Sequence, residues 1–299
     1  MKYSKHLLGC LVPILPPSVK TDWSNVGAGY DVSGDIIMTP SLFLKRIILA
    51  LCARLSDHDL VEVLLAAVKA RVETLTPADA LKLLFRLDAE FYPLQGWMSV
   101  AYGGGLHTKH RHTKYHDFFT KRVYPGERVL DLGCGNGALS RDVAEKSGAW
   151  VLGIDLNPDH INIAKKTYSH PRVVFEHGDV LTANIQGSFD TVIMSNVLEH
   201  LENRSEFLRR VTERIQPRRF LLRVPTFERD WRVPLKAELG IEYRLDPTHC
   251  IEYTLETFAE EMAQSGLTIV HQEVRWGEIW AEAVPDENQP SSPENQSFP

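Results

Sequence analysis

Several features that would place the chain in a specialised class of proteins are absent from its sequence. There is no Cys-x-x-Cys pair, and the four cysteines lie far apart, as Cys10, Cys52, Cys134 and Cys250. This spacing predicts reduced thiols in a cytoplasmic protein rather than a disulfide framework or a zinc site. Basic residues are not in excess either, because the formal net charge is −6. A protein whose main partner is nucleic acid would be expected to carry a basic surface.

No apolar run is long enough to predict a membrane span. The longest candidate, residues 42–55, contains three cationic side chains, whereas a span needs about 20 apolar residues. The apolar stretch at residues 7–12 is followed by three prolines between residues 13 and 17. We therefore expect neither a membrane anchor nor export, and predict a cytoplasmic protein.

The distribution of apolar residues and breakers divides the 299 residues into four segments. We predict an irregular segment at 1–39, a helical cap or lid region at 40–105, and an α/β domain at 106–284. The last segment, 285–299, is rich in Pro, Ser, Asn and Glu and is predicted to be disordered because it cannot bury enough apolar surface.

The helical region contains three amphipathic patterns. The first covers about residues 41–55, and Ser56 with Asp59 forms a capping-box-like start for the second. Thr76, followed by Pro77 at the first helical position, opens the third. Because helix faces usually bury against a core, we expect a cap on the α/β domain. A substrate lid and a dimer element are the alternatives.

Strands and helices alternate from residue 127 onward, which predicts a parallel sheet covered on both faces. The expected strands are 128–133, 150–155, 173–177, 189–196 and 220–224, with helices at 142–147, 159–168 and 206–215. The rhythm then changes to a helix at 254–264 and two strands, 268–275 and 279–284. A tight turn near Gly277 is expected to join these two strands as an antiparallel pair.

The most informative segment is Val129 to Ala138, in which a strand leads to Asp131 and then to three glycines at alternate positions. Glycine lets the backbone turn sharply and approach a ligand, as at the carboxyl end of the first strand of a nucleotide-binding sheet. The glycines also fit the dinucleotide pattern of an NAD-dependent oxidoreductase. Asp131 argues against that interpretation, because its carboxylate would repel a pyrophosphate but suits a cofactor with an ammonium and a sulfonium.

This segment resembles motif I, Asp-x-Gly-x-Gly-x-Gly, of class I S-adenosylmethionine (SAM) methyltransferases. The resemblance spans about residues 124–285 and implies an α/β fold with a Rossmann-like seven-stranded sheet whose last strand is antiparallel. It also implies SAM as the cofactor and marks 106–284 as the methyltransferase domain. The cofactor-binding residues that it implies are Asp131, Gly133, Cys134, Gly135, Asn136, Gly137, Asp155, Leu156, Asp179, Val180 and Asn196.

Four of these positions have defined roles in the family. Asp155, at the end of the second strand, is expected to accept hydrogen bonds from the ribose hydroxyls, with a helix cap near Asn157 as the alternative. Asp179 is expected to reach the adenine amino group. Leu156 and Val180 would supply the apolar faces of the adenine slot.

The segment Gly103 to His116 is unusual, and three interpretations of it compete. One is a metal site formed by His107, His110, His112 and His116, although these spacings are not those of a zinc motif. Another is a polyphosphate or nucleic-acid patch formed by Lys109, Arg111 and Lys114. We favour a lid, hinged at the three glycines, in which Arg111 pairs with the cofactor carboxylate. This arrangement is similar to the segment ahead of motif I in quinone O-methyltransferases, and we predict no metal site.

A hydroxyl acceptor would profit from a general base. The candidate bases are His112, His116, His200 and His249. Residues 225–253 are expected to form a substrate-side insertion, whose Trp231, Arg232, Tyr243 and Arg244 fit a sugar or a charged aromatic acceptor. Alternatively, these side chains only anchor a long loop.

We therefore predict a SAM-dependent methyltransferase that methylates an oxygen of a small molecule or glycan precursor by in-line transfer. The segment after the fourth strand, Ser195 to Leu198, lacks the [Asn/Asp]-Pro-Pro-aromatic motif of DNA amino-methyltransferases. Part of the C-terminal sequence is similar to methyltransferases of polysaccharide pathways. A SAM-binding regulatory protein without activity and an NAD-dependent oxidoreductase are the alternatives.

Overall fold

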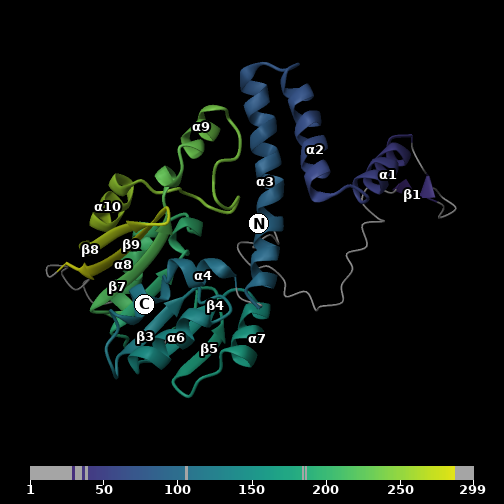
Figure 1. Ribbon diagram of the computed structural model, residues 1–299. Coiled ribbons are helices and arrows are strands. Elements are labelled where there is room, and N and C mark those ends of the chain that lie inside the picture. Colours follow the sequence, from purple (N-terminus) through teal and green to yellow (C-terminus); the bar gives the residue numbers. More distant parts are fainter. Residues whose placement is uncertain are drawn as a thin grey trace. The chain divides into compact units, whose positions relative to one another are not determined.

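The computed structural model describes residues 29–30, 36–37, 40–104, 107–183, 185 and 187–286 (Figure 1). Most of the predicted irregular segment 1–39 and of the predicted disordered tail 285–299 lies outside the described residues. So do Cys10, Gly105 and the predicted division between residues 105 and 106. The chain forms two compact units, one with the described residues up to Met98 and the other with those from Ser99 onward.

The N-terminal unit is mostly helical. Its elements are β1 (Gly29–Tyr30), β2 (Ile36–Ile37), α1 (Pro40–Cys52), α2 (Asp57–Val72) and α3 (Pro77–Tyr102), the last of which continues into the second unit. The predicted helix starts are confirmed, because the Ser56 hydroxyl accepts a hydrogen bond from Asp59 N and the Thr76 hydroxyl accepts one from Asp79 N, each at 3.2 Å.

Apolar side chains of this unit are widely exposed. No residue of α2 is buried, and α3 buries only Ala80 and Phe85. Leu49, Leu65 and Met98 each expose more than half of their surface. A cap on the α/β domain, a substrate lid and a dimer element therefore all remain predictions for these helices. None of the described helices has the length and apolar character needed to cross a membrane.

The second unit is built on a seven-stranded sheet with the order β5-β4-β3-β6-β7-β9-β8. The strands are β3 (Arg128–Leu132), β4 (Trp150–Asp155), β5 (Val173–His177), β6 (Thr191–Ser195), β7 (Arg219–Pro225), β8 (Leu267–Arg275) and β9 (Glu278–Pro285). Strands β3 to β7 pair in parallel, whereas β9 is antiparallel to both of its neighbours. This confirms the Rossmann-like sheet with an antiparallel last strand.

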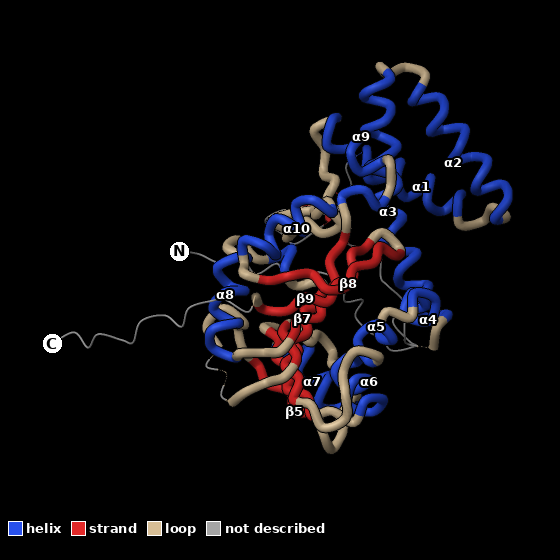
Figure 2. The backbone as a smooth tube through the Cα atoms, turned by 90° about the vertical axis from the view of Figure 1, so that its left-hand side faces the viewer, coloured by secondary structure: helices blue, strands red, loops and turns tan. Residues whose placement is uncertain are grey.

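Helices cover both faces of this sheet (Figure 2). The helices of this unit are α4 (Thr108–Thr113), α5 (His116–Thr120), α6 (Ala138–Ser147), α7 (Pro158–Thr167), α8 (Arg204–Ile215), α9 (Arg232–Glu238) and α10 (Leu255–Gln264), with short 3₁₀ turns η2 (Leu198–His200) and η3 (Phe227–Arg229). Helix α9 lies away from the sheet (Figure 1). Alternation along β3 explains the two layers, because successive strand side chains point to opposite faces. Leu130 packs in the core that includes residues of α8 and α10, whereas Val129 packs in the core that includes residues of α5 and α6.

Three helices were not expected from the sequence. Helix α4 lies in the segment predicted as a lid, α5 begins at its last residue, His116, and α9 lies in the predicted insertion 225–253. The tight turn near Gly277 is confirmed, since Trp276 and Gly277 both have positive φ, 55° and 73°. A two-residue turn of this kind matches the twist of an antiparallel pair.

Candidate functional site

The glycine loop after β3 leaves part of its backbone open to a ligand. Gly133, Gly135 and Gly137 all have positive φ, at 74°, 55° and 83°. A Cβ atom on Gly133 would overlap the side chain of Val197, and one on Gly137 would lie 2.5 Å from Cζ of Phe175. A Cβ atom on Gly135 would meet nothing within 4 Å. The outer glycines are therefore needed for packing, while the backbone around Gly135 borders open space.

Asp155 holds this loop in place. Its Oδ2 accepts a hydrogen bond from Gly135 N at 2.8 Å, and its Oδ1 accepts one from Asn157 N at 2.9 Å. His160 Nδ1 lies 3.2 Å from the same Oδ1. Burial opposes ionisation of this carboxyl, but these hydrogen bonds outweigh it and lower its pKa. The helix cap considered as an alternative is provided by Asn157, whose side chain accepts from Asp159 N. Asp155 is therefore an ionised group at the carboxyl edge of the sheet.

Asp131 lies beneath the loop and is only 1% exposed. The Ser140 hydroxyl donates a hydrogen bond to its Oδ2 at 2.5 Å. Burial raises the pKa of Asp131 to about 7, against the opposing effect of the Ser140 hydrogen bond. A nearby cation would favour the ionised form, so this carboxyl is suited to a positively charged ligand.

The remaining predicted cofactor positions differ in their surroundings. Leu156 is 47% exposed, as expected for a side chain that meets a ligand. Asp179 is partly exposed, and its Oδ1 accepts from Leu181 N at 2.9 Å. Val180 packs against the main core. Cys134 lies in the small core around Phe175, where burial raises the pKa of its thiol.

Two positions remain on the glycine loop and after β6. Asn136 is bound within the loop, where its Oδ1 accepts from Ala138 N at 3.3 Å. Asn196 follows β6 in a left-handed conformation, with φ of 57°. Its Oδ1 is buried and has no hydrogen-bond partner among the described residues. Such an unpaired acceptor costs free energy unless a ligand satisfies it.

Two of the four candidate bases lie together. The ring centroids of His200 and His249 are 4.6 Å apart, with the rings at 84°. His200 Nδ1 lies 2.8 Å from the Thr248 hydroxyl, which donates to Asp246 Oδ1 at 2.7 Å. The Thr248 oxygen therefore accepts the proton of His200 Nδ1, and the Nε2 atom of His200 keeps its lone pair.

The second ring of this pair is held by a carboxylate. His249 Nδ1 lies 2.8 Å from Glu252 Oε1, and both side chains are at most 4% exposed. Burial and the neighbouring His249 lower the pKa of His200, so its ring is neutral near pH 7. A neutral, half-buried imidazole with a bare Nε2 atom can accept a proton.

Glu199 completes the only group of three or more potential metal ligands among the described residues. Its ligand atoms and those of His200 and His249 lie within 4.8 Å of one another. The Glu199 carboxyl is fully buried, and neither oxygen has a partner in the described part of the chain. Burial raises its pKa to about 8. The four histidines considered for a metal site at residues 107–116 do not form such a group.

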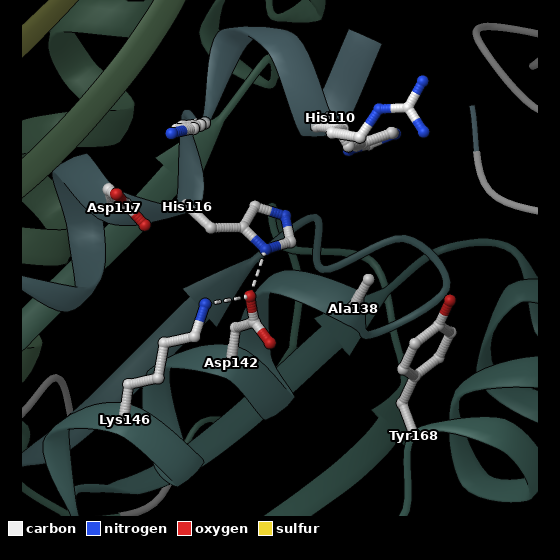
Figure 3. A pocket seen from close by; sticks show the side chains of 9 residues that line it. His110, His116, Asp117, Ala138, Asp142, Lys146 and Tyr168 are labelled. Atoms are coloured by element: carbon white, nitrogen blue, oxygen red, sulfur yellow. Dashed lines mark hydrogen bonds and ion pairs between the residues drawn. The ribbon is translucent and has the colours of Figure 1, made fainter. Parts of the chain in front are cut away.

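The other two candidate bases lie elsewhere. His112 is exposed on α4. His116 Nδ1 lies 2.7 Å from Asp142 Oδ2, and Lys146 Nζ donates to the same oxygen at 2.8 Å (Figure 3). This trio belongs to a cavity of about 420 Å³ along α6, which we name the α6 groove. Its lining residues are His110, Arg111, Lys114, His116, Asp117, Ala138, Asp142, Lys146 and Tyr168. Arg111 therefore lines the same cavity as Ala138, the first residue of α6 after the glycine loop.

The insertion 225–253 is organised by its own ion pairs. Arg232 pairs with Asp230, and Arg244 pairs with Glu242. Trp231 is 71% exposed. Arg229, which the sequence did not single out, pairs with Glu252 and donates to Tyr243 O at 2.7 Å. Arg229, Arg232 and Arg244 therefore each form an ion pair within this segment.

The chain resembles known methyltransferases. Residues 107–272, more than half of the chain, match the model of a family described as a methyltransferase domain. A chain of the complex between the Haloferax volcanii Trm112 methyltransferase activator and a methyltransferase superposes with a TM-score of 0.51 at 17% identity. The superposition covers 64% of this chain and 97% of that one, and it shows a common fold.

Relatives found by sequence have a higher sequence identity to this chain than the superposed structure does, but they match a shorter region. The mitochondrial ubiquinone biosynthesis O-methyltransferase of Schizosaccharomyces pombe is 35% identical over 105 residues, which are 33% of this chain and 38% of that protein. The ubiquinone biosynthesis O-methyltransferase of Azorhizobium caulinodans is 34% identical over 133 residues, 44% of this chain and 52% of that protein. The chain thus spans about half the length, or less, of these relatives.

Proposed function

The chain belongs to the family of methyltransferase domains, and we propose that it transfers the methyl group of SAM to a hydroxyl oxygen of a small molecule. The observation that carries this proposal is the open backbone at Gly135, held by the ionised carboxylate of Asp155. Asp131 lies below the same loop. Two carboxyl groups beside an open glycine loop suit a nucleoside with a cationic tail and disfavour a pyrophosphate.

We assign the predicted contacts to the cofactor as follows. Asp155 would accept hydrogen bonds from the ribose hydroxyls, and Asp179 from the adenine amino group. Leu156, which is 47% exposed, would cover one face of the adenine. Asn196 would use its unpaired Oδ1 for the methionine part. Cys134 would contribute through its backbone, because its side chain packs in the core.

Proton removal falls to His200. Bound SAM supplies an already activated methyl group, so the protein has to orient the acceptor, exclude water and remove a proton. His200 follows β6 on the same connection as Asn196, and its Nε2 lone pair is fixed by the Thr248 and Asp246 hydrogen bonds. The ring of His249 packs edge-on against the ring of His200, and Glu252 pairs with His249.

For the acceptor, we favour a hydroxylated aromatic molecule over a glycan precursor. The relatives described above are O-methyltransferases of ubiquinone biosynthesis. Arg232 and Arg244, which suggested a charged acceptor, each pair with a carboxylate two residues away. The cytoplasmic location predicted from the cysteine spacing belongs to this proposal, as does the absence of a nucleic-acid partner.

The proposal is tested by methyl transfer from labelled SAM to a panel of catechols, phenols and sugars. We expect turnover with a catechol or phenol and its loss in His200→Ala, while His271→Ala, at an exposed position on the edge strand β8, stays active. Binding of S-adenosylhomocysteine (SAH) without turnover on any acceptor would favour the regulatory alternative. Preferential binding of NADH would favour the oxidoreductase.

A further inference from the structure

The α6 groove carries a positive charge that nothing in the described part of the chain neutralises. Two carboxylates line it, and each already has a cationic partner. Asp142 accepts from His116 and Lys146, and Asp117 Oδ2 lies 3.6 Å from Lys121 Nζ. The hydrogen bond from His116, together with Lys146, lowers the pKa of Asp142 to about 2, so this carboxylate stays ionised and paired.

Two further cations line the same groove. Arg111 and Lys114 form no ion pair with a described residue. Like charges gathered in one cavity repel each other, so this arrangement favours an anion between them. The glycine loop, by contrast, lies beside Asp131 and Asp155. The two neighbouring sites therefore select ligands of opposite charge.

The backbone at Lys114 supports a role for its side chain. Lys114 is the C-cap of α4 and has a left-handed conformation, with φ of 51°. Glycine or asparagine is the usual residue at such a position, and a lysine there is strained. This turn directs the chain from α4 into α5. It thereby brings Lys114 and His116 to the lining of the same cavity.

Two imidazole nitrogens of the groove also lack partners. His116 uses Nδ1 for Asp142, and its Nε2 atom is buried without a hydrogen-bond partner among the described residues. His110 Nδ1 is buried and unpaired in the same way. In Figure 3 the ring of His116 lies between Asp142 and His110. With a proton on each of these two nitrogens, the rings would donate hydrogen bonds to a ligand that carries several oxygen atoms.

We propose that the α6 groove binds the phosphate group of a second ligand, separate from the cofactor at the glycine loop. Lys114 and Arg111 supply the unpaired charge, and Tyr168 supplies a hydroxyl on the lining. Phosphate fits better than a carboxylate, because its three terminal oxygens can accept more of the available N–H and O–H groups. The cavity, at about 420 Å³, lies within the range of roughly 300–1,000 Å³ typical of small-molecule sites.

Calorimetric titration of the full chain with inorganic pyrophosphate at low ionic strength tests this proposal. The informative variant is Lys114→Gly, since glycine suits the left-handed backbone and the protein is expected to fold. We expect its dissociation constant to rise about tenfold, as for the loss of one charge-assisted hydrogen bond. The matched control, Lys109→Ala, removes the same charge from α4 outside the groove and should change the constant less than twofold.

The outcomes separate this proposal from the proposed function. Equal dissociation constants for Lys114→Gly and Lys109→Ala, or no pyrophosphate binding at all, would overturn the groove site. Binding of heparin without binding of pyrophosphate would do the same, since it would indicate a general basic surface. Titration with SAH in parallel tests the cofactor site alone. Glycerol 3-phosphate and phosphatidic acid vesicles then distinguish a soluble phosphate from a lipid headgroup.

Discussion

His249 Nδ1 lies 2.8 Å from Glu252 Oε1, and neither side chain is more than 4% exposed. Glu252 also pairs with Arg229 and accepts a hydrogen bond from Leu245 N at 2.7 Å. One buried carboxylate thus joins His249, a member of the candidate base pair, to two other parts of the insertion 225–253. Burial opposes its ionisation, but the hydrogen bond from His249 and its other partners lower its pKa.

Glu252→Gln should therefore destabilise the protein. Breaking a buried pair leaves an uncompensated group, at a cost of about 3 kcal/mol in the free energy of unfolding. Urea unfolding at pH 7 measures this loss, with Glu242→Gln at the exposed Arg244 pair as the control. Because the folded pKa lies below the ordinary value of 4.5, the contribution is present above that pH and is lost as the pH falls through the folded pKa. Equal unfolding free energies for both variants would refute this role.

His200→Ala should abolish most of the turnover without weakening cofactor binding. Loss of a general base lowers kcat by about 100-fold or more. Because burial and His249 lower the pKa of His200, the base should remain active at pH values below 6.5. The pH dependence of kcat measures this. A profile whose acid limb lies at or above pH 6.5, or an unchanged kcat in the variant, would exclude His200 as the base.

Asp131→Asn should stabilise the folded protein at pH 8 and weaken its binding of SAM. The pKa of Asp131 is raised from 3.8 to about 7 in the folded protein, so the folded state binds this proton more tightly. Stability from this group is present below pH 3.8 and is lost as the pH rises through about 7. At pH 8 the variant should therefore be more stable by about 2 kcal/mol or more, while binding SAM more weakly. Asp159→Asn, at an exposed position on α7, is the control. A less stable Asp131→Asn protein would contradict this account.

Removal of metal ions should leave methyl transfer intact. Glu199, His200 and His249 could hold a divalent ion, but the proposed mechanism uses the Nε2 lone pair of His200 for a proton. The raised pKa of Glu199, about 8, also keeps this carboxyl largely neutral at pH 7. Dialysis against EDTA followed by the methyl-transfer assay measures the effect. Loss of activity that Mn²⁺ or Zn²⁺ restores would show that the group is a metal site instead.

Periodicity and the glycine loop were sufficient to predict the sheet. The strands at 150–155 and 173–177 are found with the predicted limits, because short apolar runs between flanking breakers mark their ends. Short helices were harder to predict. Helix α4 is rich in charged and polar residues and begins after His107, whose ring accepts from Lys109 N in place of a usual capping side chain. Helix α9 contains Pro234, which disfavours a helical interpretation.

The candidate site was predictable in its residues but not in its pairings. His200 and His249 were both named, but only the fold places residues so far apart in sequence side by side. Glu252 carries no local signal, because a single glutamate in a loop is usually exposed. The separation of His116 from this pair also depends on the docking of α5 on α6. Long-range packing therefore decides which of the four histidines can act together.

The most direct test of the account is calorimetric titration of the full chain with SAH, with NADH in parallel. We expect micromolar binding of SAH, none of NADH, and loss of SAH binding in Asp155→Ala, because Asp155 holds Gly135 and is proposed to bind the ribose hydroxyls. Binding of NADH, or SAH binding that Asp155→Ala leaves unchanged, would contradict the assignment of the glycine loop as a SAM site.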